Sequence, residues 1–311
     1  MGSNYGSLLI VLLLLLGYVL VQAQSTDEST GKIPDNVNMF VSGNFSGTRQ
    51  ATVRSCDCGW RNTESTDLKI VGGYETGVNE FPAMAALIQL STGSLFCGAT
   101  IIADRYLLTA AHCVYNRYAS TLGVLVGDHN ITSGTDTAYS ALYYVNAYAI
   151  HPNYSTSTYN NDIAIIQTTS QMTFSTYVAP ICLPFYYSTY DFSGQQVIIL
   201  GWGQLEFSGP TSDTLQMAAL DVITNTYCNQ LLSNTVTTSE MCTYTSGKDS
   251  CQSDSGGPLL WTNSLNSRMY LVGIISHGIG CALDSPGINT RVTSFLNWIV
   301  STTTDASYCA L

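Results

Sequence analysis

Short runs of apolar residues, separated by turn-forming residues, dominate the chain from Ile70 onward. The clearest runs are Ala83–Leu90, Ala99–Ile102, Leu122–Val126, Ile163–Ile166, Val197–Leu200, Gln216–Val222, Pro258–Trp261 and Tyr270–Ile275. Runs this short between Gly, Ser, Asn and Pro are typical of strands in a β-barrel or a β-sandwich. The pattern therefore predicts an all-β fold.

Helical periodicity is confined to two segments, Thr226–Leu232 and Thr293–Val300. In the second segment the apolar residues would share one face of a helix, and Thr293 would be its N-cap. We therefore expect one short helix near the C-terminus beside the β-structure.

The N-terminal region differs in composition from the rest of the chain. Leu8–Val21 is apolar apart from Gly17, and Val21-Gln22-Ala23 offers small residues for a signal peptidase. A membrane span takes about 20 apolar residues, so this shorter run predicts a signal peptide and a secreted protein. Residues 24–55 are rich in Ser, Thr, Asn and Gly and predict a flexible propeptide or linker.

Charge and cysteine content narrow the class of partner. Ten basic and 21 acidic residues give a net charge of −11, which argues against nucleic acid or an anionic membrane as a partner. Ten cysteines, an even number, favour disulfides in an oxidising compartment, because no paired metal-binding motif is present. Sequons at Asn44, Asn130 and Asn153 predict N-glycosylation.

Basic residues are unevenly distributed along the chain. Five of the ten precede Ile70: Lys32, Arg49, Arg54, Arg61 and Lys69. An enzyme that cuts after Lys and Arg would find few sites in its own remaining sequence, although compositional drift explains the scarcity equally well.

The octapeptide Cys-Gln-Ser-Asp-Ser-Gly-Gly-Pro at residues 251–258 carries the candidate chemistry, with Ser255 between an acid and two glycines. A serine hydroxyl is a weak nucleophile at neutral pH and needs a base and an orienting acid. Upstream, Thr-Ala-Ala-His-Cys supplies His112, and Asn-Asn-Asp-Ile-Ala supplies Asp162. A fourth motif, Lys-Ile-Val-Gly-Gly, begins at Lys69.

These four motifs, in this order, resemble those of the chymotrypsin-like serine proteases, and the resemblance covers Ile70 to the C-terminus. It implies two antiparallel six-stranded β-barrels with a C-terminal helix. It also implies that Ser255 is the nucleophile, His112 the base and Asp162 the orienting acid, with Ser276 hydrogen-bonded to that acid. The segment around Cys56–Asn62 is similar to the junction in arthropod CUB-serine proteases, including venom and salivary enzymes, but the preceding residues are too few for a CUB domain.

The resemblance also implies activation and substrate specificity. Cleavage after Lys69 would release the amino group of Ile70 to pair with Asp254, so the chain divides into a signal peptide (1–23), a propeptide or linker (24–69) and a protease domain (70–311). Asp249 would lie at the base of a pocket for Arg or Lys, with the remaining pocket residues Ser250, Gly278 and Gly287.

Three positions depart from the family pattern. Ser253 replaces a glycine that, with Ser255, contributes a backbone N–H group to the oxyanion hole. Because serine keeps that donor, we expect altered rather than abolished catalysis, with protein inhibitors affected more than small substrates. His277 replaces a tryptophan beside the substrate and Asn289 a tyrosine below the pocket, which leaves the preference for extended substrates open.

By the same resemblance, the disulfides would be Cys97–Cys113, Cys228–Cys242, Cys251–Cys281 and Cys58–Cys182. Cys56 and Cys309 stay unassigned, with a bond between them as one option. Asp128 and Asp136 lie in a loop similar to the calcium loop of trypsin. That loop is short and lacks glutamates, so we expect no cofactor, with calcium as the alternative.

The sequence thus predicts a secreted, monomeric, trypsin-like serine endopeptidase made as a zymogen. Its partners would be protein substrates with Lys or Arg and protein protease inhibitors. The alternatives are a catalytically silent homologue that acts as a binding or cofactor protein, which only Ser253 favours, and an adaptor that works through its N-terminal segment. A digestive, a salivary or venom, and a cascade setting all remain open.

Overall fold

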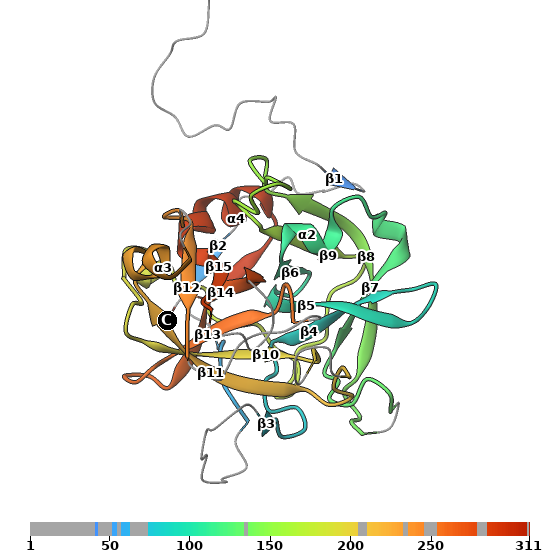
Figure 1. Ribbon diagram of the computed structural model, residues 1–311. Coiled ribbons are helices and arrows are strands. Elements are labelled where there is room, and N and C mark those ends of the chain that lie inside the picture. Colours follow the sequence, from blue (N-terminus) through green and yellow to red (C-terminus); the bar gives the residue numbers. More distant parts are fainter. Residues whose placement is uncertain are drawn as a thin grey trace, which may run out of the picture. The chain divides into compact units, whose positions relative to one another are not determined.

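The structure is a computed structural model of the 311-residue chain. It describes residues 41–42, 52–54, 57–62, 74–133, 136–204, 210–232, 236–245, 254–278, 285–309 and 311. All of these belong to one compact unit, Asn38–Leu311. Two closed six-stranded antiparallel β-barrels make up most of the described part, as the sequence predicted (Figure 1).

The first barrel lies on the right of Figure 1, in cyan to green. Its strands are β4 (Met84–Gln89), β5 (Ser94–Ala103), β6 (Tyr106–Thr109), β7 (Leu122–Val126), β8 (Ala141–Ile150) and β9 (Ala164–Thr168). They are hydrogen-bonded in the order β8-β7-β4-β5-β6-β9, and a β8–β9 pairing closes the ring. Closure leaves no unpaired edge within the barrel.

The second barrel lies on the left, in yellow to red (Figure 1). Its strands are β10 (Gln196–Gly201), β11 (Gln216–Ile223), β12 (Glu240–Thr243), β13 (Pro258–Asn263), β14 (Arg268–Gly278) and β15 (Gly287–Arg291). They follow the order β10-β13-β14-β15-β12-β11, and β10–β11 closes the ring. A short strand, β3 (Tyr74–Glu75), pairs with the outer side of β11.

The two barrels are filled by different side chains. Aliphatic residues dominate the first interior, where Leu87, Ile101 and Leu108 are fully buried. In the second barrel, Trp261 contacts the aromatic rings of Phe192 and Tyr187 at centroid distances of 5.4 and 5.1 Å. Trp261 and the fully buried Val197 belong to one cluster of buried apolar residues, which stabilises this barrel by removing apolar surface from water.

Helices are short in the described part. They are α2 (Ala111–Val114), α3 (Asn225–Leu232) and α4 (Leu296–Thr302), with 3-10 turns at Ala119–Thr121, Phe185–Tyr187 and Val292–Phe295. The last two α-helices match the predicted helical segments. The prediction that Thr293 is an N-cap is wrong, because Thr293 lies inside the 3-10 turn that leads directly into α4.

Two short strands occur in the segment that was expected to be irregular. β1 (Val41–Ser42) pairs antiparallel with β8, and β2 (Thr52–Arg54) pairs parallel with β16 (Ser307–Cys309). Neither strand has an apolar pattern of its own. Each forms by adding backbone hydrogen bonds to a strand of the protease domain.

Residues 57–62 are attached to the protease domain by covalent and polar contacts. Cys58 forms a disulfide with Cys182, and the next backbone N–H, that of Gly59, donates to Pro180 O at 3.0 Å. A Cβ atom at Gly59 would collide with the carbonyl oxygen of Met269, so this contact requires glycine. Further along, Arg61 forms an ion pair with Glu80 at 2.5 Å.

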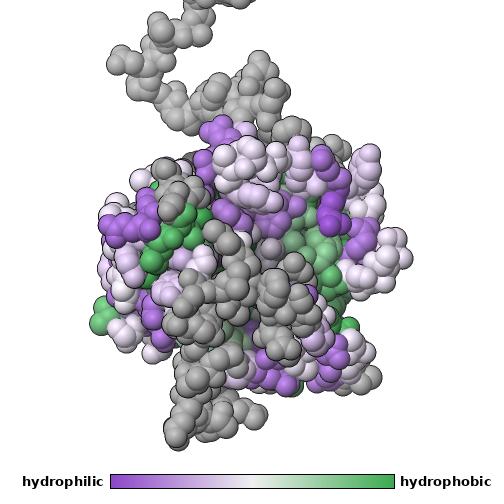
Figure 2. All heavy atoms as spheres, viewed as in Figure 1, coloured by the Kyte–Doolittle hydropathy of each residue, from purple (hydrophilic) through white to green (hydrophobic). Residues whose placement is uncertain are grey.

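Polar and apolar residues are both present on the visible surface. Figure 2 shows hydrophilic and neutral residues over most of the described surface on one side, with apolar residues in separate areas. No helix in the described part of the chain is long and apolar enough to cross a membrane.

His151, just after β8, couples protonation to the packing of the C-terminal helix. Its ring contacts Phe295 and Trp298 edge-on, at centroid distances of 5.0 and 5.1 Å. Its Nδ1 accepts the backbone N–H of Asn153 at 3.3 Å, which requires an unprotonated nitrogen. Burial lowers the pKa of His151 to about 4.

We expect this histidine to contribute to acid destabilisation. The unfolded chain, with an imidazole pKa near 6.5, binds a proton that the folded chain excludes, so stability is full above that pH and falls as the pH drops toward 4. Lowering the pH from about 7.5 to about 4.5 should therefore reduce the melting temperature of the wild type more than that of His151→Phe. Parallel melting curves for the two proteins across that range would contradict the assignment.

Candidate active site

The turn before β13 presents Ser255 between the two barrels. Gly256 has a φ of 78°, in the left-handed region, and its N–H donates to Ile275 O at 2.8 Å. A Cβ atom at Gly256 would collide with Thr109 Oγ1. Glycine is required there for both reasons, so the Ser-Gly pair of the motif fixes the direction of the serine.

Strands of the first barrel hold this turn of the second barrel. The Gly98 N–H on β5 donates to Ser255 O at 2.8 Å, and Thr109 Oγ1 on β6 donates to Gly98 O at 2.8 Å. A Cβ atom at Gly98 would lie 2.8 Å from Gly257 Cα. Two backbones therefore approach each other directly at the junction of the barrels.

His112 lies on α2, immediately after β6, and it faces the carboxylate of Asp162. The His112 backbone N–H donates to Asp162 Oδ1 at 2.9 Å, and Nδ1 lies 2.7 Å from Oδ2. The Asp162 side chain is fully buried, whereas the His112 side chain is 22% exposed. Since a carboxylate accepts hydrogen bonds, the imidazole proton lies on Nδ1, which leaves Nε2 of the neutral ring free to take a proton.

Two further hydroxyl groups hold Asp162. Ser276 Oγ, on β14, donates to Asp162 Oδ2 at 2.6 Å. Thr290 Oγ1, on β15, donates to the backbone carbonyl of Asp162 at 2.7 Å. Burying a carboxylate costs free energy unless donors satisfy its oxygens, so the hydrogen bond from Ser276 stabilises the negative charge of Asp162 at this position.

Ser255 and His112 lie on either side of the Cys97–Cys113 disulfide. Cys113 Sγ is 3.7 Å from His112 Nε2 and 3.7 Å from Ser255 O. Among the described residues, no hydrogen bond joins the Ser255 hydroxyl to His112. Such bonds are often long in substrate-free enzymes and shorten in the Michaelis complex.

The predicted pocket is described in part. Gly278 on β14 and Gly287 on β15 are paired across the sheet. A Cβ atom at Gly278 would meet Gly287 Cα at 3.8 Å, and no other described atom is within 4 Å. Among the described residues, therefore, nothing but Gly287 borders the side-chain position of Gly278. The other predicted pocket and oxyanion residues, Asp249, Ser250 and Ser253, lie outside the described residues.

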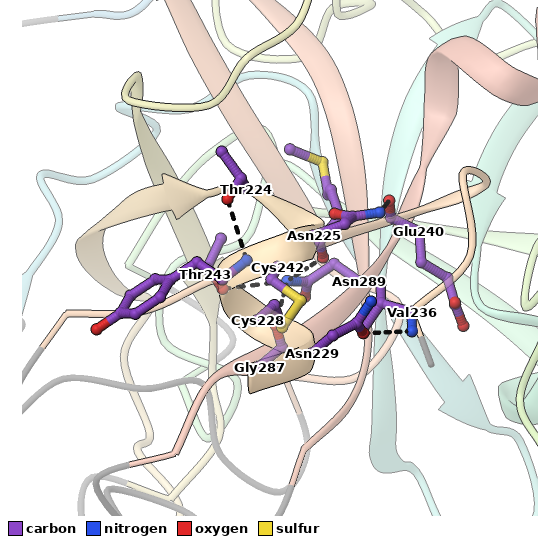
Figure 3. Close-up of a disulfide and its surroundings, with 12 residues drawn as sticks. Thr224, Asn225, Cys228, Asn229, Val236, Glu240, Cys242, Thr243, Gly287 and Asn289 are labelled. Carbon is purple, nitrogen blue, oxygen red and sulfur yellow. Dashed lines mark hydrogen bonds between the residues drawn. A yellow bond between two sulfur atoms is a disulfide. The ribbon is translucent and has the colours of Figure 1, made fainter. Parts of the chain in front are cut away.

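Asn289 is buried behind these glycines. Its Nδ2 donates to Thr243 Oγ1 at 3.1 Å, and Figure 3 shows it beside Thr243 and the Cys228–Cys242 disulfide. The amide thus links β12 and β15 by a side-chain hydrogen bond. It is 3% exposed, so it cannot contact substrate directly.

Tyr159 joins the site although no sequence motif singled it out. Its ring stacks on His277 at a centroid distance of 5.0 Å and meets the His112 ring edge-on at 5.8 Å. Tyr159 has a φ of 58°, which is rare for an aromatic residue. Its proximity in sequence to Asp162 was the only signal that could have pointed to it.

Of the residues predicted to take part in activation, the structure describes Asp254. Asp254 Oδ1 accepts the N–H of Gly203 at 2.8 Å, and a Cβ atom at Gly201 would collide with this carboxylate. The backbone of Gly201–Gly203 therefore approaches Asp254 closely. Lys69 and Ile70, the predicted cleavage residues, lie outside the described residues.

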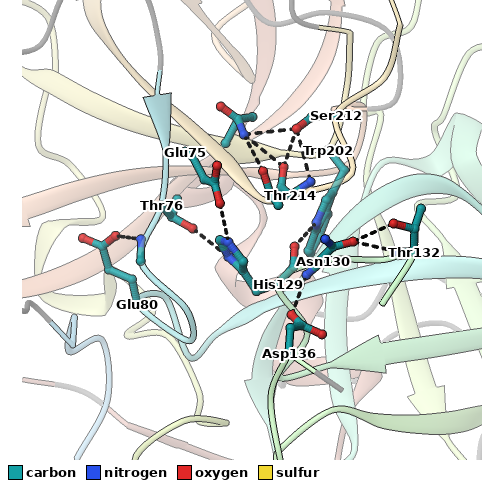
Figure 4. Close-up of polar contacts among 12 residues, drawn as sticks. Glu75, Thr76, Glu80, His129, Asn130, Thr132, Asp136, Trp202, Ser212 and Thr214 are labelled. Atoms are coloured by element: carbon teal, nitrogen blue, oxygen red, sulfur yellow. Dashed lines mark hydrogen bonds and ion pairs between the residues drawn. The ribbon is translucent and has the colours of Figure 1, made fainter. Parts of the chain in front are cut away.

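The loop that resembles a calcium site contains two partly satisfied carboxylates. Asp136 Oδ2 accepts the Asn130 N–H at 2.8 Å, and Asp128 Oδ2 accepts the Ser140 hydroxyl at 2.5 Å. The Oδ1 atom of each is buried without a hydrogen-bond partner, and burial raises the pKa of Asp128. Figure 4 shows the loop, with His129 3.0 Å from Glu75.

Among the described side chains, one group of three has the proximity expected of metal ligands. It consists of Cys97, His112 and Cys113, with ligand atoms within 4.8 Å of one another. Both sulfurs are joined in a disulfide with a Cα–Cα distance of 6.2 Å. The sulfur atoms of a disulfide cannot act as thiolate ligands, so this group is a disulfide beside His112 and does not indicate a metal site.

The structure contains three of the disulfides implied by the resemblance: Cys58–Cys182, Cys97–Cys113 and Cys228–Cys242. Cys309 is also disulfide-bonded. The remaining cysteines, Cys56, Cys251 and Cys281, lie outside the described residues.

Two of the three predicted glycosylation sites are described. Asn153 is exposed, on the loop that leads to Asp162. Asn130 Oδ1 accepts the backbone N–H of Thr132 at 3.0 Å and its hydroxyl at 2.8 Å. Asn44 lies outside the described residues.

Comparisons with known proteins agree with this geometry. The family model described as Trypsin matches residues 70–299, and the chain therefore belongs to the trypsin family of serine endopeptidases. Venom serine protease 34 of Apis mellifera is 42% identical over 261 residues, which are 83% of this chain and 63% of that protein. The chain thus spans less than two thirds of this relative.

Two other relatives align over more of their length. Venom serine protease of Polistes dominula is 40% identical over 85% of this chain and 94% of that protein. Proclotting enzyme of Tachypleus tridentatus is 36% identical over 78% of this chain and 68% of that protein.

The close approach of Gly98 to the nucleophile turn generates a prediction. In Gly98→Ala, the added methyl group would push against the Gly257 backbone and displace Ser255. A misplacement of about 1 Å can lower kcat by roughly 100-fold, so we expect a fall of about 10- to 100-fold in the activated enzyme.

Gly93→Ala is the matched control for this substitution. Gly93 has a positive φ of 67°, unlike Gly98, and a Cβ atom there would meet no described atom within 4 Å. The control should lower the melting temperature and leave kcat unchanged. Equal kcat values for the two variants would refute the proposed role of the Gly98 contact.

Proposed function

We propose that this protein is a secreted, trypsin-like endopeptidase that hydrolyses peptide bonds after Arg and Lys through an acyl-enzyme. The observation that supports this most strongly is the hydrogen-bonded pair of His112 and the buried Asp162 beside Ser255. That arrangement gives a base to a hydroxyl that is otherwise a weak nucleophile.

The chemistry proceeds in two stages. Ser255 Oγ attacks the scissile carbonyl carbon while His112 Nε2 takes the hydroxyl proton, and the imidazolium then gives this proton to the leaving amine. Water repeats the sequence in the second stage and releases the acyl group. Asp162 keeps the imidazole in the reactive tautomer and stabilises its cation.

Substrate specificity rests on the glycine pair and on Asp249. The absence of side chains at Gly278 and Gly287, which are paired across the sheet, would leave room for a long substrate side chain. A carboxylate at the end of such a slot selects a guanidinium or ammonium group by charge pairing. We assign that role to Asp249, with Ser250 beside it.

Activation follows from the position of Asp254. We infer that cleavage after Lys69 frees the amino group of Ile70 to form a buried ion pair with Asp254, one residue before the nucleophile. A buried charge is costly without its partner, so the pocket and oxyanion hole are completed only after cleavage.

Ser253 changes the surroundings of the oxyanion hole without removing a donor. Its N–H and that of Ser255 would stabilise the oxyanion, while its hydroxyl would lie toward the leaving-group side. We therefore expect the serine to affect protein inhibitors, which contact that side, more than small substrates.

Secretion, protein substrates and protein inhibitors fit the remaining observations. The apolar N-terminal run and the disulfides favour an oxidising, extracytoplasmic compartment. Relatives named as venom serine proteases are consistent with a secreted enzyme. The proposed mechanism uses side chains and backbone N–H groups of the chain itself. No step of it uses the loop with Asp128 and Asp136 that resembles a calcium-binding loop.

Hydrolysis of matched Arg, Lys, Phe and Ala peptide amides tests this proposal. Activity on the Arg and Lys amides should appear only after limited trypsin treatment exposes Ile70. Ser255→Ala, treated in the same way, is the control and should be inactive. An exposed Ile70 terminus without activity, or without labelling of Ser255 by a phosphonate probe, would favour the silent homologue instead.

The disulfide between Cys58 and Cys182 predicts a two-chain enzyme. After cleavage at Lys69 the N-terminal segment should stay attached, so a non-reducing gel shows one species and a reducing gel shows two. Lys69→Gln should stay one species under both conditions. Release of the N-terminal segment without reductant would contradict the prediction.

A further inference from the structure

His277 occupies an unusual position on β14. In a regular strand, successive side chains point to opposite faces, so Ser276 and His277 would be separated. The β14–β15 register shifts between Ile275 and His277, where His277 is paired with Ile288. This irregularity lets both side chains reach the catalytic site, because a bulge changes the direction of the side chains around it.

The two hydrogen bonds of the Ser276 hydroxyl define which group donates. Ser276 Oγ lies 2.6 Å from Asp162 Oδ2 and 3.0 Å from His277 Nδ1. The shorter distance is that of a hydroxyl donating to a carboxylate, and the longer one is that of an N–H group donating to oxygen. Since the hydroxyl has one proton, which goes to the charged acceptor, the ring proton of His277 lies on Nδ1.

A second aromatic residue fixes the plane of this ring. Tyr159 stacks on His277 with an interplanar angle of 29° and contacts His112 edge-on at 74°. The three rings lie in a row, and both imidazoles are connected to Asp162 Oδ2, His112 directly and His277 through Ser276.

We propose that His277 is a positioning residue of the catalytic site, whose Nδ1–H keeps the Ser276 hydroxyl on Asp162 and so sets the basicity of His112. The proposal rests on the proposed protease activity. An oxygen that accepts a hydrogen bond becomes a better donor, so His277 strengthens the bond from Ser276 to Asp162. A stronger hydrogen bond offsets more of the negative charge of Asp162. Because that negative charge favours protonation of His112, the hydrogen bond makes His112 less basic.

The charge of His277 adds to this effect. Burial is the main influence on its pKa and lowers it, Glu240 and Asp162 act in the opposite direction, and His112 lowers it further. Across the sheet, the paired residues of β15, Gly287 and Ile288, contribute no titratable group. His277 is therefore neutral at neutral pH, and in acid its cation would oppose a second positive charge on His112.

The tautomer can be tested directly in the folded protein. Nitrogen NMR of histidine labelled with ¹⁵N gives separate signals for the ring nitrogens of four histidines, and His277→Phe identifies those of His277. At about pH 7.5, where a buried imidazole is neutral, we expect a proton on Nδ1 and none on Nε2. The reverse tautomer would overturn the proposal, whether or not the protein is an active protease.

Two substitutions separate the hydrogen bond from the ring. His277→Phe keeps an aromatic ring for Tyr159 and loses the donor, whereas His277→Asn keeps an N–H donor near the Nδ1 position and loses the ring. In the activated enzyme, His277→Phe should move the acid limb of the kcat/KM profile up by about 0.3 of a pH unit. His277→Asn should recover most of that shift at neutral pH.

A third variant tests whether the effect passes through Ser276. In a Ser276→Ala background, His277→Phe should produce no further shift of the acid limb, because the relaying hydroxyl is absent. An equal shift in both backgrounds, or equal shifts for His277→Phe and His277→Asn, would overturn the proposal. Failure of the wild type itself to hydrolyse an Arg amide would instead contradict the proposed function.

Discussion

Burial of the Asp162 carboxylate is the constraint on which the site depends. A fully buried negative charge is tolerated only when donors surround it, and here they come from separate elements. His112 contributes from α2 and Ser276 from β14. The charge therefore ties the first barrel to the second, and an element that moved would leave it unsatisfied. The same requirement that makes the site costly to assemble also makes its geometry rigid.

Glycine provides the second link between the barrels, through backbone contact rather than charge. At Gly98 and Gly257 the two backbone segments are too close for any side chain. Gly256 has a φ in the left-handed region, which disfavours a side chain. These positions place Ser255 O within hydrogen-bonding distance of β5. Ser255, in the turn before β13 of the second barrel, is thus held by a backbone contact from the first barrel and lies beside the His112–Asp162 pair of that same barrel, which explains why the site lies at the junction of the two barrels.

Sequence predicted the fold class, and it singled out candidate catalytic residues, because both leave local patterns. Apolar runs marked β7 and much of β4, β10, β11, β13 and β14, and the motifs singled out His112, Asp162 and Ser255. The runs missed β12 and β15, whose residues include Glu240, Asn289 and Thr290, polar side chains that are buried by tertiary contacts. They also missed β8, in which Tyr143, Tyr144 and Asn146 interrupt the apolar residues. Tyr159 was missed because its role depends on a left-handed backbone and a ring that is distant in sequence.

The histidine at position 277, where the family usually has a tryptophan, illustrates how one substitution in an unchanged fold can extend a hydrogen-bond network. A tryptophan at this position has one donor and no titratable group, so it cannot donate through a ring nitrogen adjacent to Ser276 and also change charge. An imidazole can do both, provided that the strand irregularity brings it next to Ser276 and that Tyr159 holds its plane. The strand irregularity or the Tyr159 stacking alone would be an ordinary packing feature. Together they connect His277 to the buried carboxylate through Ser276, so under the proposal above a residue at the predicted substrate-binding surface would also affect the base.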